Sequence, residues 1–222
     1  MNKIKLCIFD MDGLLIDTER CAWSIGKITI GKEYGVNITP ELSADLTGFD
    51  RRSFVAETKK LYGQDFPGDE FMDKLARHYE NFCRNEEIPL RPGAIELLNF
   101  VKQNNILLSL GTSTDKELAE IALKKTGLEN YFDYKVFGNQ VKHGKPNPEI
   151  YLKSVEHFGL RPEDCVVFED TPTGAKAAYD GNINLIMVPD LKKPTDLDRK
   201  KALAIIYSLQ DAISIIKKIN NI

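Results

Sequence analysis

The stretch Leu6–Leu15 constrains the fold of this chain more than any other. Four apolar residues, Leu6–Phe9, lead directly into Asp10 and Asp12, which is typical of a strand that is buried on both faces and ends at a functional edge. Residues two apart in an extended chain point to the same side, and Gly13 permits a tight turn. Two carboxylates would then share a small volume, which requires a cation, a proton or a substrate group to compensate their charge. Asp-x-Asp-Gly also occurs in ordinary turns, so the rest of the sequence must distinguish a catalytic site from a turn.

The composition describes a globular chain that can build a substantial core. Its 222 residues are 42% hydrophobic and 28% charged, which suits one large domain or a core domain with a smaller appendage. The formal net charge is −3 and no basic stripe occurs, so we expect no nucleic-acid partner. The first apolar run is too short and too acidic for a signal peptide or a membrane span, so we expect a cytoplasmic protein without a membrane partner. The four cysteines are widely spaced, which predicts reduced thiols rather than a zinc site or disulfides.

Residues 18–85 have few strand signals and a helical pattern. One helical stripe, which ends before Gly35, consists of Trp23, Lys27, Ile30 and Tyr34. Further helices are predicted at residues 51–62 and 69–84, because Gly63 ends the first and Pro67-Gly68 precedes the second. We expect a helical insertion of about 70 residues, a size within the range of a small domain.

From residue 88 onward, predicted strands and helices alternate. Apolar runs predict strands at residues 106–110, 134–137, 165–168 and 185–188, and an edge strand at 202–206. The helix starts between them are predicted at Pro92-Gly93, at Thr114 with Glu117 in capping-box spacing, at Asn147 before Pro148, and at Thr171 before Pro172. Together with the strand at 6–9, this alternation predicts an α/β fold. It would have a Rossmann-like parallel sheet, helices on both faces, and ligands at the carboxyl ends of the strands.

Four polar clusters follow strands of this sheet and would meet at one edge. They are Asp10 with Asp12, Thr112 with Ser113, Lys145, and Glu169 with Asp170. Several carboxylates at one point form a site of hard oxygen ligands, which suits an octahedral cation such as Mg²⁺ together with water and a phosphate oxygen. A lysine and a hydroxyl residue at neighbouring strand ends would contact the other phosphate oxygens.

An aspartate at this edge can be the nucleophile of phosphoryl transfer. The reaction needs charge neutralisation and an aligned nucleophile, and Asp10 could form an aspartyl-phosphate. A second acid must protonate the leaving oxygen and then activate water, and Asp12 could reach the far side of the phosphorus. The sequence therefore predicts a two-step hydrolysis of a phosphate ester.

In order and spacing, the four clusters resemble the haloacid dehalogenase superfamily of phosphatases and phosphomutases. The stretches DMDGLLIDTE, from Asp10, and FEDTPTGAKAA, from Phe168, resemble its β-phosphoglucomutase-like branch, which carries a helical cap. The resemblance covers the whole chain. It implies a Rossmann-like core domain of residues 1–16 and 89–222, and a helical-bundle cap domain of residues 17–88 that closes over the substrate.

The resemblance also implies catalytic and metal-binding roles. Asp10 would be the nucleophile and a metal ligand, and Asp12 would be the acid/base whose backbone carbonyl binds the metal. Asp170 would be the third protein ligand of Mg²⁺. Glu169 would bind the metal directly or support one of its ligands.

Phosphate and substrate contacts are implied in the same way. Phosphate would be held by Thr112, by the backbone of Ser113 and by Lys145, which also balances the acids. The stretch Gly48–Arg51 resembles a cap loop that reaches into the site, so Arg51 is the candidate for gripping the distal part of the substrate.

Two positions depart from the pattern of the branch. No histidine follows Asp17-Thr18, although the mutases use one in proton transfer, and Asn139-Gln140 stands where relatives often carry an acid. We therefore expect a Mg²⁺-dependent phosphatase, monomeric or weakly oligomeric, that acts on a small phosphorylated metabolite such as a sugar or polyol phosphate. The sequence leaves open a sugar phosphomutase of the β-phosphoglucomutase type and a catalytically inactive binding or regulatory homologue. A dehalogenase fits least, because that chemistry has no use for Asp12.

Overall fold

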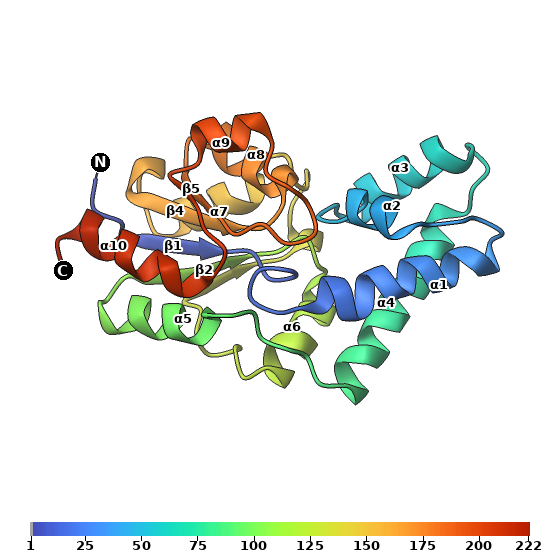
Figure 1. Ribbon diagram of the computed structural model, residues 1–222, viewed down its shortest axis with the longest axis horizontal. Helices are drawn as coiled ribbons and strands as arrows, with labels where there is room; N and C mark the ends of the chain where they lie inside the picture. The colour runs from blue at the N-terminus through green and yellow to red at the C-terminus, as the bar shows by residue number, and fades with distance from the viewer. Residues whose placement is uncertain (1) are drawn as a thin grey trace.

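The structure is a computed structural model that describes residues 2–222. These residues contain a parallel sheet of six strands (Figure 1). The strand order is β3-β2-β1-β4-β5-β6, and every neighbouring pair is parallel. The strands are β1 (Leu6–Phe9), β2 (Leu107–Gly111), β3 (Tyr134–Val136), β4 (Cys165–Glu169), β5 (Asn184–Met187) and β6 (Ala204–Ile205). The predicted α/β fold is confirmed, and each predicted strand overlaps an observed one, including the edge strand.

Helices occupy both faces of the sheet and a separate region beside it (Figure 1). Those after β1 are the π-helix η1 (Glu19–Ser24), α1 (Ile25–Glu33), α2 (Pro40–Asp45), α3 (Arg51–Tyr62) and α4 (Gly68–Asn85). Those of the sheet region are α5 (Ala94–Gln103), α6 (Lys116–Lys125), α7 (Glu149–His157), α8 (Pro172–Asp180), α9 (Asp196–Lys201) and α10 (Ala212–Asn220), with short 3₁₀ turns at 138–140, 162–164 and 209–211. Across residues 2–222, no helix combines the length and the apolarity that a membrane crossing needs.

Alternation along β1 explains why helices cover both faces of the sheet. Leu6 and Ile8 belong to a hydrophobic cluster with side chains of α7 and α8, whereas Cys7 and Phe9 belong to another with side chains of α5, α6 and α10. All four residues of β1 are fully buried. A central strand covered on both sides needs a continuous apolar run, and Leu6–Phe9 provides one.

Helices α1–α4 lie beyond the carboxyl ends of the strands and pack around their own hydrophobic cluster (Figure 1). Phe54 and Phe71 stack with ring centroids 5.9 Å apart, and Phe66 lies 5.7 Å from Phe71. The helices predicted in this region are present, whereas η1 and the short α2 were not predicted. The exact division into a core of residues 1–16 and 89–222 and a cap of residues 17–88 stays a prediction.

Two predicted helix starts need correction. Thr114 does not cap a helix, because α6 begins at Lys116 and the Thr114 hydroxyl donates to Asp12 instead. The helix α7 begins at Glu149, so Pro148 is its N-cap and not its first residue as predicted. Asn147 Oδ1 still accepts from the Glu149 amide at 3.0 Å. The predicted cap of α8 is confirmed, since the Thr171 side chain accepts from the Gly174 amide.

Candidate active site

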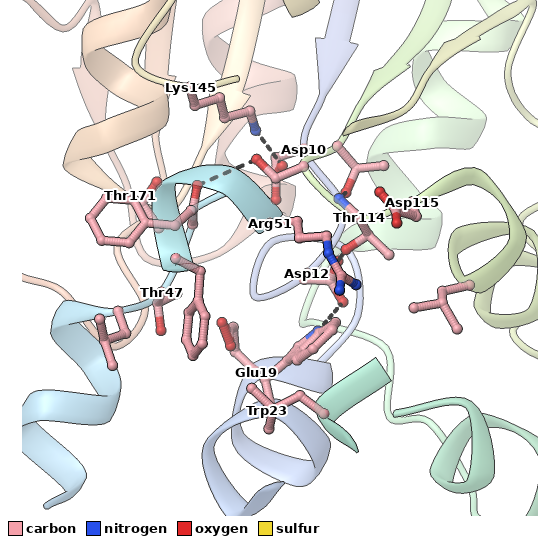
Figure 2. Close-up of a pocket in the computed structure, with 18 of the residues that line it drawn as sticks. Asp10, Asp12, Glu19, Trp23, Thr47, Arg51, Thr114, Asp115, Lys145 and Thr171 are labelled. Atoms are coloured by element: carbon pink, nitrogen blue, oxygen red, sulfur yellow. Dashed lines mark hydrogen bonds and ion pairs between the residues drawn. The ribbon is translucent and has the colours of Figure 1, made fainter. Parts of the chain in front are cut away.

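The four polar clusters meet at the carboxyl edge of the sheet, as parallel strands require. Asp10 follows β1, Thr112 and Ser113 follow β2, and Glu169 and Asp170 stand at the end of β4. Lys145 lies on the loop between β3 and α7. All of these residues line one pocket together with side chains from η1, α1, α3 and α4, and Figure 2 shows Lys145 and Asp10 facing each other at one end of it. The structure thus brings together residues up to 160 positions apart, from Asp10 to Asp170.

Lys145 is the buried counter-charge of two of the acids. Its Nζ donates to Asp10 Oδ1 at 2.5 Å and to Glu169 Oε1 at 2.7 Å, and its side chain is 1% exposed. Burial alone would lower the pKa of Lys145, but Asp10 and Glu169 raise it well above its usual value. Lys145 therefore keeps its positive charge inside the site.

Glu169 has its hydrogen-bonding capacity filled by protein groups. Besides Lys145, its Oε1 accepts from the Tyr151 hydroxyl at 2.9 Å, while Oε2 accepts from the Thr171 amide and hydroxyl at 2.8 and 3.0 Å. Burial raises the pKa of Glu169, but the charge of Lys145 and its hydrogen bond to Glu169 lower it by more, so the net shift of the pKa is downward. The role of Tyr151 was not predicted from the sequence, because no sequence pattern shows which aromatic residue on the buried face of a helix donates a hydrogen bond to an acid of the site.

Asp170 is the acid that lacks a protein partner. The residue is 2% exposed, and its Oδ1 is buried without a hydrogen-bond partner among residues 2–222. Burial and the negative charges of Glu169 and Asp10 raise its pKa well above the usual value. A buried, unpaired carboxylate beside two others is costly unless a cation is bound.

These acids fit a hard divalent cation. Asp10, Glu169 and Asp170 each offer one carboxylate oxygen, and the three oxygens lie within 4.8 Å of one another. Gly13 has a φ of +85°, and a side chain there would collide with the Asp170 carboxylate, so the backbone packs directly against the acid. Oxygen ligands of this kind are those that Mg²⁺ prefers in proteins.

Asp12 lies at the junction between the sheet and helices α1–α4, where it accepts four hydrogen bonds. Its Oδ1 accepts from the Thr18 hydroxyl, from Trp23 Nε1 at 3.3 Å and from the Tyr79 hydroxyl at 3.0 Å. Its Oδ2 accepts from the Thr114 hydroxyl at 2.7 Å. Figure 2 shows Trp23 and Thr114 directed at Asp12. The stripe of residues 23–34 pointed to Trp23 as a buried residue, but no sequence signal pointed to its contact with Asp12.

Thr112 and Ser113 occupy the turn after β2. Thr112 Oγ1 accepts from the Thr114 amide at 3.1 Å, which shapes the turn so that both residues line the pocket. Ser113 Oγ donates to the carbonyl of Gly48 at 3.3 Å and so links this turn to the loop between α2 and α3. Donors at the end of a strand in this position can bind a phosphate group.

Arg51 lines the same pocket but already has protein partners. One of its guanidinium nitrogens donates to Asp73 Oδ1 at 2.7 Å and to the carbonyl of Asp69 at 3.1 Å. Figure 2 places Arg51 between the Lys145 end of the pocket and the end occupied by Glu19 and Trp23. Substrate binding by Arg51 stays a prediction.

The far end of the pocket contains a buried ion pair within an apolar wall. Glu19 and Lys27 lie 3.8 Å apart, and Lys27 also donates to the Ser43 carbonyl at 2.9 Å. Burial raises the pKa of Glu19 and lowers that of Lys27, while each charge opposes the shift of the other. Glu19 Oε2 has no hydrogen-bond partner within the described chain. The apolar wall consists of Trp23, Leu46, Phe49, Phe54, Met72, Leu75, Ala76 and Leu118.

Comparison with known proteins identifies a matching family. The sequence pattern of the family described as haloacid dehalogenase-like hydrolase matches residues 7–188, which include all four clusters. The chain is 36% identical over 179 residues to a phosphorylated carbohydrates phosphatase of Thermotoga maritima, covering 81% of this chain and 82% of the relative. It is 32% identical over 196 residues to a probable pseudouridine-5'-phosphatase of Drosophila melanogaster, covering 86% and 84%.

A solved structure also matches over nearly the whole chain. It is a putative β-phosphoglucomutase from Thermotoga maritima, 32% identical in sequence, with a TM-score of 0.72. The match covers 97% of this chain and all of the other. The likeness therefore includes the helices α1–α4 as well as the sheet.

Proposed function

The chain belongs to the haloacid dehalogenase-like hydrolases as a phosphatase, and from this premise we propose that it hydrolyses a small phosphorylated metabolite in a Mg²⁺-dependent reaction through an aspartyl-phosphate. The observation that carries the proposal is the contact of Lys145 with both Asp10 and Glu169, beside the unpartnered Asp170. One lysine and three acids leave a surplus of buried negative charge at the point where a phosphate would bind. A bound cation would compensate this surplus negative charge and would allow a phosphate ester to bind next to the acids.

Asp10 is the proposed nucleophile. Lys145 holds its Oδ1, which leaves the other carboxylate oxygen to attack the phosphorus and form a phosphoryl–oxygen bond. The bond from phosphorus to the leaving oxygen breaks, and Asp12, which enters this step protonated, gives that oxygen its proton. The product alcohol then departs, with the phosphoryl group on Asp10.

Asp12 is the proposed acid and base of both steps. Its four hydrogen bonds hold the carboxylate between the sheet and the cap, where the leaving oxygen of a substrate in the pocket would lie. In the second step, Asp12 takes a proton from water, and the resulting hydroxide attacks the phosphorus of the aspartyl-phosphate. Inorganic phosphate leaves, and Asp10 is regenerated.

The remaining cluster residues hold charge in place. Lys145, Thr112 and the backbone of Ser113 would bind the phosphate oxygens. Asp10, Asp170 and the carbonyl of Asp12 would hold Mg²⁺, which when bound neutralises negative charge on the phosphoryl group. Since both oxygens of Glu169 accept hydrogen bonds, we assign Glu169 to positioning Lys145 rather than to direct contact with the metal.

A sugar or polyol phosphate is the proposed substrate class. Support comes from the relatives, which are named as phosphatases of phosphorylated carbohydrates and of pseudouridine 5'-phosphate. Glu19 at the far end of the pocket offers a free acceptor for a substrate hydroxyl, and Arg51 lies along the path to it. A cytoplasmic location, a monomeric or weakly oligomeric state, and the lack of nucleic-acid and membrane partners stay predictions.

The experiment that tests this function is phosphate release from a panel of phosphorylated metabolites in the presence of Mg²⁺. We expect turnover of at least one sugar or polyol phosphate, loss of turnover on addition of EDTA, and its recovery with excess Mg²⁺. Asp10→Asn should lower kcat by about 10³-fold or more, because the amide is a poor nucleophile. Asp65→Asn, at an exposed turn residue, is the matched control and should leave kcat unchanged. Full activity of Asp10→Asn, or full activity in EDTA, would refute the mechanism.

The same assay separates the alternatives. A mutase would return the phosphoryl group to a sugar, so radiolabelled phosphate would appear in an isomeric sugar phosphate rather than in free phosphate. An inactive homologue would release no phosphate from any member of the panel. We expect the label in free phosphate, because the chain has no histidine after Asp17-Thr18 to assist transfer to a sugar.

A further inference from the structure

The loop between β5 and α9, residues 188–195, reaches from the sheet to the cap (Figure 1). Lys192 on this loop donates from Nζ to the carbonyl of Asp45 at 2.8 Å and to the carbonyl of Thr47 at 3.0 Å. The donor and its acceptors are 147 and 145 residues apart in the chain. This contact therefore joins the two parts of the molecule between which a substrate would lie.

The acceptors stand at the C-terminal end of α2, where carbonyl groups lack partners within the helix. The last four carbonyls of a helix carry partial negative charge and are commonly bound by lysine or arginine side chains. Here the lysine comes from the sheet side, not from the helix itself. On the inner side, Lys27 donates to the carbonyl of Ser43 and to the hydroxyl of Thr47, so the end of α2 is held from two directions.

The segment that Lys192 holds forms a wall of the active-site pocket. Residues 46–49 all line the pocket, and Figure 2 shows Thr47 on its wall. The Lys192 ammonium also lies 5.4 Å from the centre of the Phe49 ring, within the range of a cation–π contact. Gly48 packs against Thr171, and its carbonyl accepts from Ser113, so the segment also touches the phosphate end of the site.

We propose that Lys192 is a positioning residue for substrate binding: by capping α2 from the sheet side, it holds residues 45–49 in place as the wall that contacts the leaving group. Within residues 2–222, Lys192 makes no hydrogen bond or ion pair with the acids of the site, and its direct contacts are with this segment. Loss of the ammonium group would leave the end of α2 held by Lys27 alone and would widen the pocket next to Phe49. The leaving group would then bind less tightly. The phosphate end of the site would keep its geometry although it touches Gly48, because the turn after β2 and the Lys145 ion pairs are held by their own hydrogen bonds.

The experiment compares Lys192→Met with two other variants, Lys192→Arg and Lys193→Met. Lys193 is the next residue in the chain, is also a lysine, and is exposed, which makes Lys193→Met the matched control. Two probes are assayed with Mg²⁺: p-nitrophenyl phosphate, whose leaving group is an aromatic ring, and acetyl phosphate, whose leaving group is small. We expect Lys192→Met to raise KM for p-nitrophenyl phosphate about tenfold with kcat changed less than about twofold. KM for acetyl phosphate should change less than about twofold. Lys192→Arg should retain most of the effect of the lysine, and Lys193→Met should match the unaltered protein.

A readout that needs no turnover accompanies the kinetics. Hydrogen exchange of the amides at residues 45–49 should be faster by about tenfold in Lys192→Met and unchanged in Lys193→Met. The inference rests on the proposed function only for the meaning of KM. If the unaltered protein hydrolyses neither these probes nor any member of the metabolite panel, the proposed function fails while the exchange comparison still decides the role of Lys192. Unchanged exchange in Lys192→Met, or equal changes in KM for both probes, would overturn the inference.

Discussion

At the scale of single residues, the site combines acids that accept hydrogen bonds from protein groups with one acid, Asp170, that has a buried oxygen without such a partner in residues 2–222. Glu169 accepts hydrogen bonds on both oxygens, and Asp10 is bound by Lys145. Asp170 is buried, lies next to both of these acids, and has a carboxylate oxygen without a partner in residues 2–222. Burial and the neighbouring negative charges raise the pKa of Asp170. A carboxyl whose pKa is higher in the folded than in the unfolded chain destabilises the fold, increasingly so as the pH rises above the unfolded value.

Asp170→Asn should therefore stabilise the metal-free protein while it removes activity. In EDTA at pH 8 we expect the free energy of unfolding to rise by about 2 kcal/mol, or Tm by roughly 4–8 °C, because the amide has the same shape and no charge. The gain should shrink as the pH falls toward about 3, where the unfolded carboxyl is itself largely protonated. Thermal unfolding with EDTA and with Mg²⁺ measures this, and Mg²⁺ should stabilise the unaltered protein more than the variant. A lower Tm of Asp170→Asn in EDTA would contradict the account of Asp170 as an uncompensated charge.

At the scale of elements, helix α4 connects two hydrophobic clusters. From Phe71 to Cys83 its buried residues recur every four positions, which places them on one face of the helix. Phe71 and Leu75 belong to the cluster among α1–α4, whereas Tyr79 and Cys83 belong to the large cluster on one face of the sheet. One continuous helix thus carries the apolar contacts of the cap and also the Tyr79 hydroxyl that donates to Asp12.

Phe71→Ala tests whether the cap is a separate unit. Phe71 is fully buried and contacts the rings of Tyr34, Phe54 and Phe66, so its truncation should cost the cap cluster about 3–5 kcal/mol. We expect faster hydrogen exchange in α1 and α3 and unchanged protection in β1 and β4. Leu61→Ala, at a partly exposed position of α3, is the control and should change neither. Equal loss of protection in the sheet would argue against the predicted division into cap and core.

At the scale of the whole molecule, the two ends of the chain are joined at the end of the sheet far from the cap (Figure 1). The Ile4 amide donates to Asn220 Oδ1 at 2.8 Å, and Asn220 Nδ2 donates to the Ile4 carbonyl at 2.9 Å. Asp164 accepts from Lys5 and Arg161 at this same end. Hydrogen bonds to Arg161 lower the pKa of Asp164 despite an opposing effect of burial, and Lys5 lowers it further. Contacts that stabilise the fold here are thus separated from those that form the active site.

The stability contributed by Asp164 should depend on pH. Its pKa is lower in the folded chain than in the unfolded chain, so its contribution is present above the unfolded pKa and is lost as the pH falls through the folded pKa. We expect Asp164→Asn to lower Tm at pH 7 and to have a smaller effect at pH 3. Activity at pH 7 and moderate temperature should be unchanged. Asp65→Asn serves again as the control, and a difference in Tm that grows on acidification would show that Asp164 does not act through its charge.

Much of the fold and the membership of the candidate site follow from the sequence alone. Runs such as Leu6–Phe9 and Cys165–Phe168 need cover on both faces, and helices between them enforce parallel strands. Parallel strands end at one edge, so the acids after β1 and β4, the hydroxyls after β2 and the lysine after β3 had to converge there. This convergence depends on topology and not on the details of packing.

Only the tertiary structure decided how the side chains at that edge are partnered. Nothing local places Tyr79 on Asp12, Tyr151 on Glu169 or Lys192 on the end of α2, because each contact joins residues from 18 to 147 positions apart. The same holds for Thr114, whose spacing to Glu117 predicted a helix cap, although its hydroxyl binds Asp12. A sequence pattern specifies which residues can serve as donors and acceptors. Their pairing depends on the three-dimensional packing of helices against the sheet, which no short stretch of sequence contains.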